Sequence, residues 1–213
     1  MPTLARKGLP AFWCTTLAKA LSGDQPCELS TWLNGRFKME KRPGREGSLA
    51  NWKAQHSAML QATVERFRAD GWKCDVERFF DVPGHTAKMS GKVDLIAQKL
   101  TCRPLIVDVK SGQPRDSDIL QVLIEMIAIP MAWQAGMTFE GLVIYPAHEV
   151  SIPPSSAAEL KPKLFALLKK LGTMPRPVAS PSDSACRFCD VPDDECAERF
   201  HIETAEAVLT AEF

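Results

Sequence analysis

The alternation of apolar and polar residues predicts helices in the first third of the chain. Segment 10–37 predicts two helical pieces, interrupted around Gly23–Pro26, where turn-forming residues gather. A longer helix is expected from Leu49 onward, because apolar side chains recur there at three- and four-residue steps on one face. The residues expected on this face are Leu49, Trp52, His56, Met59, Leu60, Val64 and Phe67.

The middle of the chain predicts strands. Two apolar runs, Cys74–Val82 and Met89–Ala97, flank a turn at Pro83-Gly84-His85 and predict an antiparallel hairpin. Pro104–Lys110 and Gly141–Pro146 have the same pattern of a short apolar run between turn residues, and they predict two further strands.

Two more helices are expected after these strands. Ser117–Gly136 is largely apolar, and Ser156–Leu171 carries leucines along one side, with Pro162 near its start. A helix, three strands, a crossover helix and a further strand predict the α/β class, with a mixed sheet flanked by helices. The 213 residues are expected to form one domain, with its core at about 49–172.

The charge balance does not single out a partner. Lys plus Arg and Asp plus Glu number 26 each, so only a local patch would attract phosphate. Such a patch is expected at Arg36, Lys38, Lys41, Arg42 and Arg45. The sequence has no run of about 18 apolar residues and no signal-peptide core, so we expect a cytoplasmic protein with no membrane partner.

Two acidic residues interrupt strands that should be dry. Asp94 and Asp108 lie in successive apolar runs, and a buried carboxylate is costly unless it is paired or binds a metal. Side chains alternate along a strand, so Lys110 should point the same way as Asp108, whereas Val107 and Val109 should point the opposite way. Two carboxylates and an ammonium on one face suit a hard divalent cation and an activated water. The alternative is a buried ion pair of either aspartate with Lys110.

Seven cysteines are many for a cytoplasmic chain, and their odd number argues against a disulfide framework. Three have the spacing of a metal chelate: Cys186, Cys189 and Cys196. A zinc ion or an iron–sulfur cluster normally needs a fourth ligand. His201 is the only later candidate. Among distant residues we favour Cys27, which follows Pro26, with Cys14 as the reserve. Cys74 and Cys102 are expected to be ordinary core residues.

Asp94, Asp108 and Lys110 together resemble the motif of the PD-(D/E)XK nuclease superfamily. The cysteine layout around them is similar to that of RecB- and AddB-like nucleases with an iron–sulfur cluster, including the CRISPR-associated RecB-like exonuclease. This resemblance implies a restriction-endonuclease-like core and a 4Fe-4S cluster that joins segments 10–48 and 173–213. Its implied cluster ligands are Cys27, Cys186, Cys189 and Cys196. The alternative is a structural zinc held by Cys186, Cys189, Cys196 and His201.

The resemblance also implies roles for individual residues. His56, Asp94, Asp108 and the carbonyl of Val109 would bind Mg²⁺ or Mn²⁺. Asp94, Asp108, Lys110 and Gln121 would be catalytic. The family has a tyrosine four residues after the glutamine, where this chain has Glu125. This departure puts in doubt the part of the motif that contacts DNA.

The function expected from this reading is a metal-dependent DNA nuclease. The resemblance favours an exonuclease acting on single-stranded DNA or DNA ends, in repair, recombination or CRISPR adaptation. The chain carries no helicase motif, so a helicase or an integrase would have to be a partner. The alternatives are a non-catalytic, cluster-containing subunit that binds DNA or a partner nuclease, and a redox or zinc protein unrelated to nucleases.

Overall fold

The computed structural model describes residues 4–25, 27–38, 46–133, 136–187 and 189–199. The strands are β1 (Leu4–Ala5), β2 (Ala11–Trp13), β3 (Phe37–Lys38), β4 (Lys73–Pro83), β5 (Lys88–Gln98), β6 (Leu105–Val109), β7 (Glu140–Ile144) and β8 (Glu149–Ile152). The helices are α1 (Cys14–Ser22), α2 (Glu28–Arg36), α3 (Glu46–Ala69), α4 (Asp116–Ala132), α5 (Pro154–Thr173), α6 (Asp183–Arg187) and the 3₁₀ turn Asp193–Glu195.

The main sheet is mixed and is built around β5. This strand pairs antiparallel with β4 along its whole length, and its other edge pairs with β2 in parallel and with β6 antiparallel. The crossover helix α4 connects β6 to β7, which are parallel, and β8 closes the sheet antiparallel to β7. The expected hairpin and the expected mixed α/β class are confirmed.

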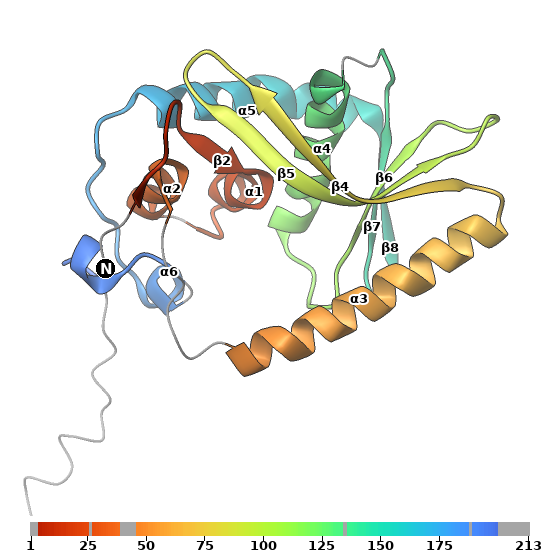
Figure 1. The fold of residues 1–213 in the computed structure, drawn as a ribbon, viewed down its shortest axis with the longest axis horizontal. Helices are drawn as coiled ribbons and strands as arrows, with labels where there is room; N and C mark the ends of the chain where they lie inside the picture. The colour runs from red at the N-terminus through yellow and green to blue at the C-terminus, as the bar shows by residue number, and fades with distance from the viewer. Residues whose placement is uncertain (1–3, 26, 39–45, 134–135, 188, 200–213) are drawn as a thin grey trace, which may run out of the picture.

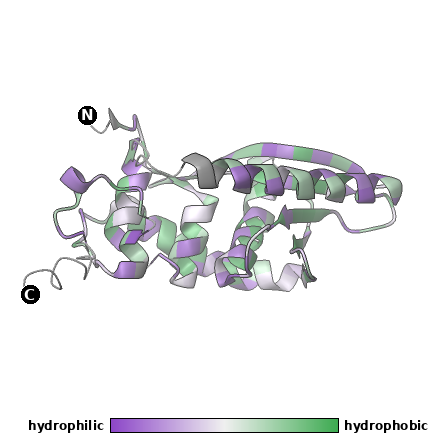
Figure 2. Cartoon of the chain, turned by 90° about the horizontal axis from the view of Figure 1, so that it is seen from below, coloured by the Kyte–Doolittle hydropathy of each residue, from purple (hydrophilic) through white to green (hydrophobic). Residues whose placement is uncertain are grey.

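Helices cover both faces of the sheet (Figure 1). On one face α1, α4 and α5 pack on strand residues such as Ile106 and Val143, in the larger core. On the other face α3 buries Leu60, Val64 and Phe67 against a smaller core. Apolar and polar residues alternate along α3, the long helix whose first turn is grey in Figure 2, as its amphipathic pattern predicts.

A third, small core joins the two ends of the chain. The helices α2 and α6, which come from opposite ends of the sequence, lie near each other in Figure 1, and Cys27, Leu29 and Leu33 pack with Ala185 and Val191. Within the described residues, no helix is both long enough and apolar enough to cross a membrane.

Several expectations about local structure were wrong. The strands β2 and β8 were not expected, because runs of three and four residues are too short to show a period of two. Trp52 was expected in the core but is 48% exposed, because the first turns of α3 extend beyond the sheet (Figure 1). Cys102 is also exposed, in the turn between β5 and β6, and Cys74 is only half-buried.

Candidate active site and cysteine pocket

The two strand acids lie on neighbouring strands of the sheet. Leu95 of β5 pairs with Val107 of β6, so the next step of this antiparallel register sets Asp94 opposite Asp108. Both residues are buried, with 8% of Asp94 and 1% of Asp108 exposed. The sheet therefore holds two carboxylates side by side in a nearly dry environment.

Lys110 follows directly after β6 and reaches back to this pair. Its Nζ lies 2.9 Å from Oδ2 of Asp108 and donates a 2.9 Å hydrogen bond to Oε1 of Gln121. A second acid, Asp118, lies 3.9 Å from the ammonium and accepts a hydrogen bond from the hydroxyl of Tyr145. The backbone N–H of Lys110 is bonded to Ile144 of β7, which fixes the position from which the side chain extends.

Gln121 connects the acids. From α4, its Nε2 donates to Oδ1 of Asp108 at 2.8 Å and to Oε1 of Glu125 at 3.0 Å. Glu125 is fully buried, and its Oε2 has no hydrogen-bond partner among the described residues. Its Oε1 also lies 3.7 Å from the thiol of Cys14. Cys14, the reserve cluster ligand, is therefore packed beside the acids and away from the other cysteines.

Asp94 is held from two sides. Its Oδ2 accepts a 3.0 Å hydrogen bond from the backbone N–H of Val109, and its Oδ1 lies 3.5 Å from Nε2 of His56. His56 comes from α3, on the other face of the sheet from α4, and stacks on Trp52. The structure thus brings together all the residues that the sequence placed at this site.

Burial and like charges shift the protonation of this cluster. Desolvation, opposed by Lys110 and reinforced by Asp94, raises the pKa of Asp108 from 3.8 to about 7. Desolvation and the charge of Asp108 raise the pKa of Glu125 well above its ordinary value. Burial lowers the pKa of Lys110, but the charge of Asp108 and its hydrogen bond outweigh burial and hold this pKa above its usual range. A hydrogen bond to Asp94 raises the pKa of His56.

The site therefore carries more acidic than basic groups. Lys110 and His56 are the basic groups beside Asp94, Asp108, Asp118 and Glu125, and this excess of acidic groups suits a divalent cation bound through oxygen. Among the described residues, however, no three His, Cys, Asp or Glu side chains are already arranged to hold a metal ion. The side chains of Lys110 and Gln121 and the backbone N–H of Val109 contact the carboxylate oxygens instead, so binding a cation would require some of these contacts to break.

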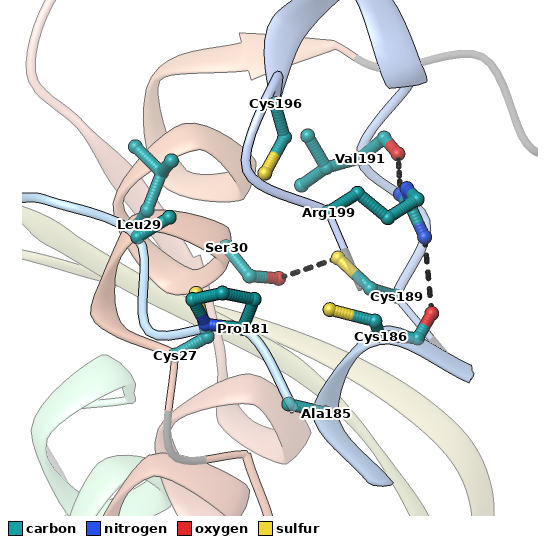
Figure 3. Close-up of a pocket in the computed structure, with 11 residues that line it drawn as sticks. Cys27, Leu29, Ser30, Pro181, Ala185, Cys186, Cys189, Val191, Cys196 and Arg199 are labelled. Carbon is teal, nitrogen blue, oxygen red and sulfur yellow. Dashed lines mark hydrogen bonds between the residues drawn. The ribbon is translucent and has the colours of Figure 1, made fainter. Parts of the chain in front are cut away.

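Four cysteines from both ends of the chain line one pocket (Figure 3). Cys27 precedes α2, Cys186 lies in α6, and Cys189 and Cys196 follow in the C-terminal segment. The thiol of Cys189 donates to the hydroxyl of Ser30, 3.4 Å away. None of the seven cysteines, all within the described ranges, forms a disulfide. His201, the ligand of the zinc alternative, lies outside the described residues.

Arg199 was not identified from the sequence, yet it organises this pocket. The side chain is buried and donates to the backbone carbonyls of Cys186, at 3.0 Å, and of Val191 (Figure 3). Its Nε lies 2.6 Å from Oδ1 of Asp193. A single guanidinium therefore fastens the segment that carries three of the four cysteines.

The expected basic patch is only partly described. Arg36 donates to the backbone carbonyls of Leu171 and Gly172 and lies 4.2 Å from the centre of the Trp32 ring, so it serves the packing of α2 on α5. Lys38 is exposed. The remaining members, Lys41, Arg42 and Arg45, lie outside the described residues.

Comparison with known proteins gives fold likenesses only. No family model matches the sequence, and no curated protein matches it. An alkaline exonuclease from Laribacter hongkongensis matches with a TM-score of 0.46 and 11% identity, covering 76% of this chain and 88% of that chain. The structure of SSO0001 matches with a TM-score of 0.43 and 14% identity, covering 86% and 85%. At these scores neither likeness assigns the chain to a family or to a function.

The raised pKa of Asp108 predicts how stability changes with pH. Between about pH 4 and 7 the folded protein keeps a proton on Asp108 that the unfolded chain has released, so the free energy of unfolding falls as pH rises. Without metal, wild type should lose up to about 1.4 kcal/mol per pH unit relative to Asp108→Asn between pH 5 and 6.5. Urea unfolding at several pH values measures this difference, and parallel pH profiles would contradict it.

Proposed function

We propose that this protein is a metal-dependent nuclease that hydrolyses phosphodiester bonds in DNA, acting as an exonuclease on single strands or ends. The observation that carries the proposal is the buried Asp94–Asp108 pair with Lys110 at 2.9 Å from Asp108. A cluster of acids in a dry sheet destabilises the fold, and such clusters occur where function requires them.

Asp94, Asp108, the carbonyl of Val109 and His56 would hold Mg²⁺ or Mn²⁺. The bound cation would lower the pKa of a water molecule and offset charge on the phosphate. These residues fit a divalent cation because the site has an excess of acidic groups, and because Oε2 of Glu125 is a buried oxygen without a hydrogen-bond partner in the described structure.

Lys110 acts in this proposal as a cation. Its pKa is held above the usual range by Asp108, so the ammonium keeps its proton at neutral pH and stabilises negative charge that develops on the phosphate. Gln121 is a positioning residue, because it binds Lys110 with its carbonyl and Asp108 with its amide. Glu125 holds the other side of that amide, at the position where the resembling family has tyrosine.

The cysteine pocket is proposed to hold a 4Fe-4S cluster through Cys27, Cys186, Cys189 and Cys196. These four thiols line one pocket together with Arg199, whose hydrogen bonds to the carbonyls of Cys186 and Val191 hold the segment that carries three of them. Because Cys27 is far in sequence from the other three, ligation would clasp both ends of the chain and contribute its binding energy to folding. A structural zinc is the alternative occupant.

One observation favours a second function, a non-catalytic subunit that binds DNA or a partner nuclease. Lys110 and Gln121 contact both oxygens of Asp108, which is the arrangement of a satisfied structural ion pair. A helicase or integrase partner, and a place in repair, recombination or CRISPR adaptation, rest on the sequence resemblance alone.

Removing the ammonium tests the enzyme directly. Lys110→Ala should lower cleavage of end-labelled single- and double-stranded DNA with Mn²⁺ or Mg²⁺ by at least about 100-fold, because charge on the phosphate would lose its stabilising cation. Lys99→Ala is the matched control, since Lys99 is exposed and contacts the carbonyl of Asp70 and the ring of Trp72, outside the candidate site. Equal cleavage by Lys110→Ala and wild type would contradict the catalytic assignment, and silence from folded wild type would favour the non-catalytic subunit.

The cluster is tested by metal content. Anaerobically purified wild type should contain about four irons and four sulfides per chain. Cys189→Ser should lose most of both and melt at a lower temperature, whereas Cys102→Ser, at an exposed position, should match wild type. One zinc per chain and no sulfide would contradict the iron–sulfur cluster and support the structural zinc.

A further inference from the structure

Two aromatic rings stand exposed beside the candidate active site. Trp13 is 41% exposed and Phe79 is 67% exposed, and their rings meet edge to face with centroids 6.3 Å apart. The ammonium of Lys92 lies 5.9 Å from the centre of the Phe79 ring. We refer to Trp13, Phe79 and Lys92 as the aromatic platform.

The sheet register places the platform along β5, two to four residues from Asp94. Phe79 of β4 pairs with Lys92 of β5, and Trp13 of β2 pairs with Ser90. Ser90 and Lys92 share the face of β5 opposite Met89 and Val93, which pack in the larger core. Asp94 follows two residues after Lys92, and His56 of α3 contacts it from the face opposite α4. At about 3.3 Å per residue, Lys92 lies roughly 7 Å from Asp94 along the strand and Ser90 roughly 13 Å. The platform thus leads along one strand to the acids.

The platform is held rigidly although it is exposed. Phe79 lies inside an 11-residue strand, and its neighbour Phe80 is buried on the opposite face against the larger core. Trp13 is the last residue of β2 and directly precedes α1, and its neighbours Phe12 and Cys14 are both buried. Exposed aromatic residues gathered at one place on a rigid sheet mark a binding surface.

We propose that the aromatic platform stacks the bases of a single-stranded nucleic acid whose phosphates enter the site at Asp94 and Asp108. This inference rests on the proposed function and names where the strand is held. Unpaired bases expose flat faces that stack on aromatic side chains regardless of sequence, whereas bases inside a duplex are already stacked on each other. Lys92 lies at the edge of the platform, where a phosphate would pass.

The charges around the platform indicate that stacking supplies most of the binding energy. Lys92 forms an ion pair with Glu77, so its charge is partly neutralised, and the chain as a whole has a net charge of zero. Binding driven by phosphate contacts falls steeply with added salt, in proportion to the number of contacts. We therefore expect affinity for single strands to depend on the bases and to fall only shallowly with salt.

The test is binding of a fluorescent oligothymidylate in the Lys110→Ala background, which separates binding from cleavage. Adding Phe79→Ala should weaken the dissociation constant about 5- to 100-fold, and an abasic strand of equal length should bind as weakly. Phe165→Ala is the matched control, because Phe165 is also exposed with a lysine ammonium 5.7 Å from its ring, but lies on α5, which contributes no residue to the site. This control should bind as the background does.

Other outcomes would overturn the proposal. Unchanged binding by the Phe79→Ala variant, or equal affinity for abasic and oligothymidylate strands, would contradict base stacking on the platform. A change from dimer to monomer in Phe79→Ala on size exclusion, with DNA binding unchanged, would make the platform a contact between two copies of this chain. If wild type cleaves DNA while Phe79→Ala binds it normally, the proposed role of the platform is contradicted and the nuclease proposal is kept. If Phe79→Ala loses DNA binding but wild type never cleaves, the platform proposal is kept and the nuclease proposal is contradicted.

Discussion

The pairing of β5 with β6 is the interaction on which the site depends. This register sets Asp94 opposite Asp108 inside a sheet covered by helices on both faces, where they are largely shielded from water. Two carboxylates so placed repel each other, and burial raises the pKa of Asp108 to about 7. The surrounding residues are arranged to offset this cost.

Each neighbour of the acids relieves part of their unfavourable burial. Lys110 supplies the opposite charge, Gln121 donates to two carboxylates at once, and the N–H of Val109 bonds Asp94. Glu125 adds a further buried acid and leaves one oxygen without a hydrogen bond in the described structure. Such a cluster lowers the stability of the fold, as is expected at a functional site. The small core around the four cysteines, held by Arg199, joins the two chain ends. Metal binding there would add to the stability of the fold.

The parts of this picture that were predictable from the sequence are those with a local signal. The runs around Asp94 and Asp108 are apolar enough to mark buried strands, so an acid inside each was conspicuous. The parts that were missed depend on contacts between distant residues. Arg199 appears in sequence as an ordinary charged residue, and only the fold shows it bonded to Cys186 and Val191. The contact of Cys14 with Glu125 spans 111 positions and carries no spacing pattern. Trp52 fits the helical period, but it lies near the start of α3, where the helix extends beyond the sheet. Periodicity alone therefore predicted a buried position wrongly.

Titration of the protein with Mn²⁺, followed by electron paramagnetic resonance of the free ion, tests the central claim that the acids form a cation site. The account predicts binding by wild type that weakens at least about tenfold in Asp94→Asn. Asp75→Asn, at a partly exposed acid paired with Arg78, should leave binding unchanged. Binding should also be tighter at pH 8 than at pH 6, because the proton on Asp108 competes with the cation. Failure of wild type to bind Mn²⁺, or equal binding by the Asp94 and Asp75 variants, would contradict it.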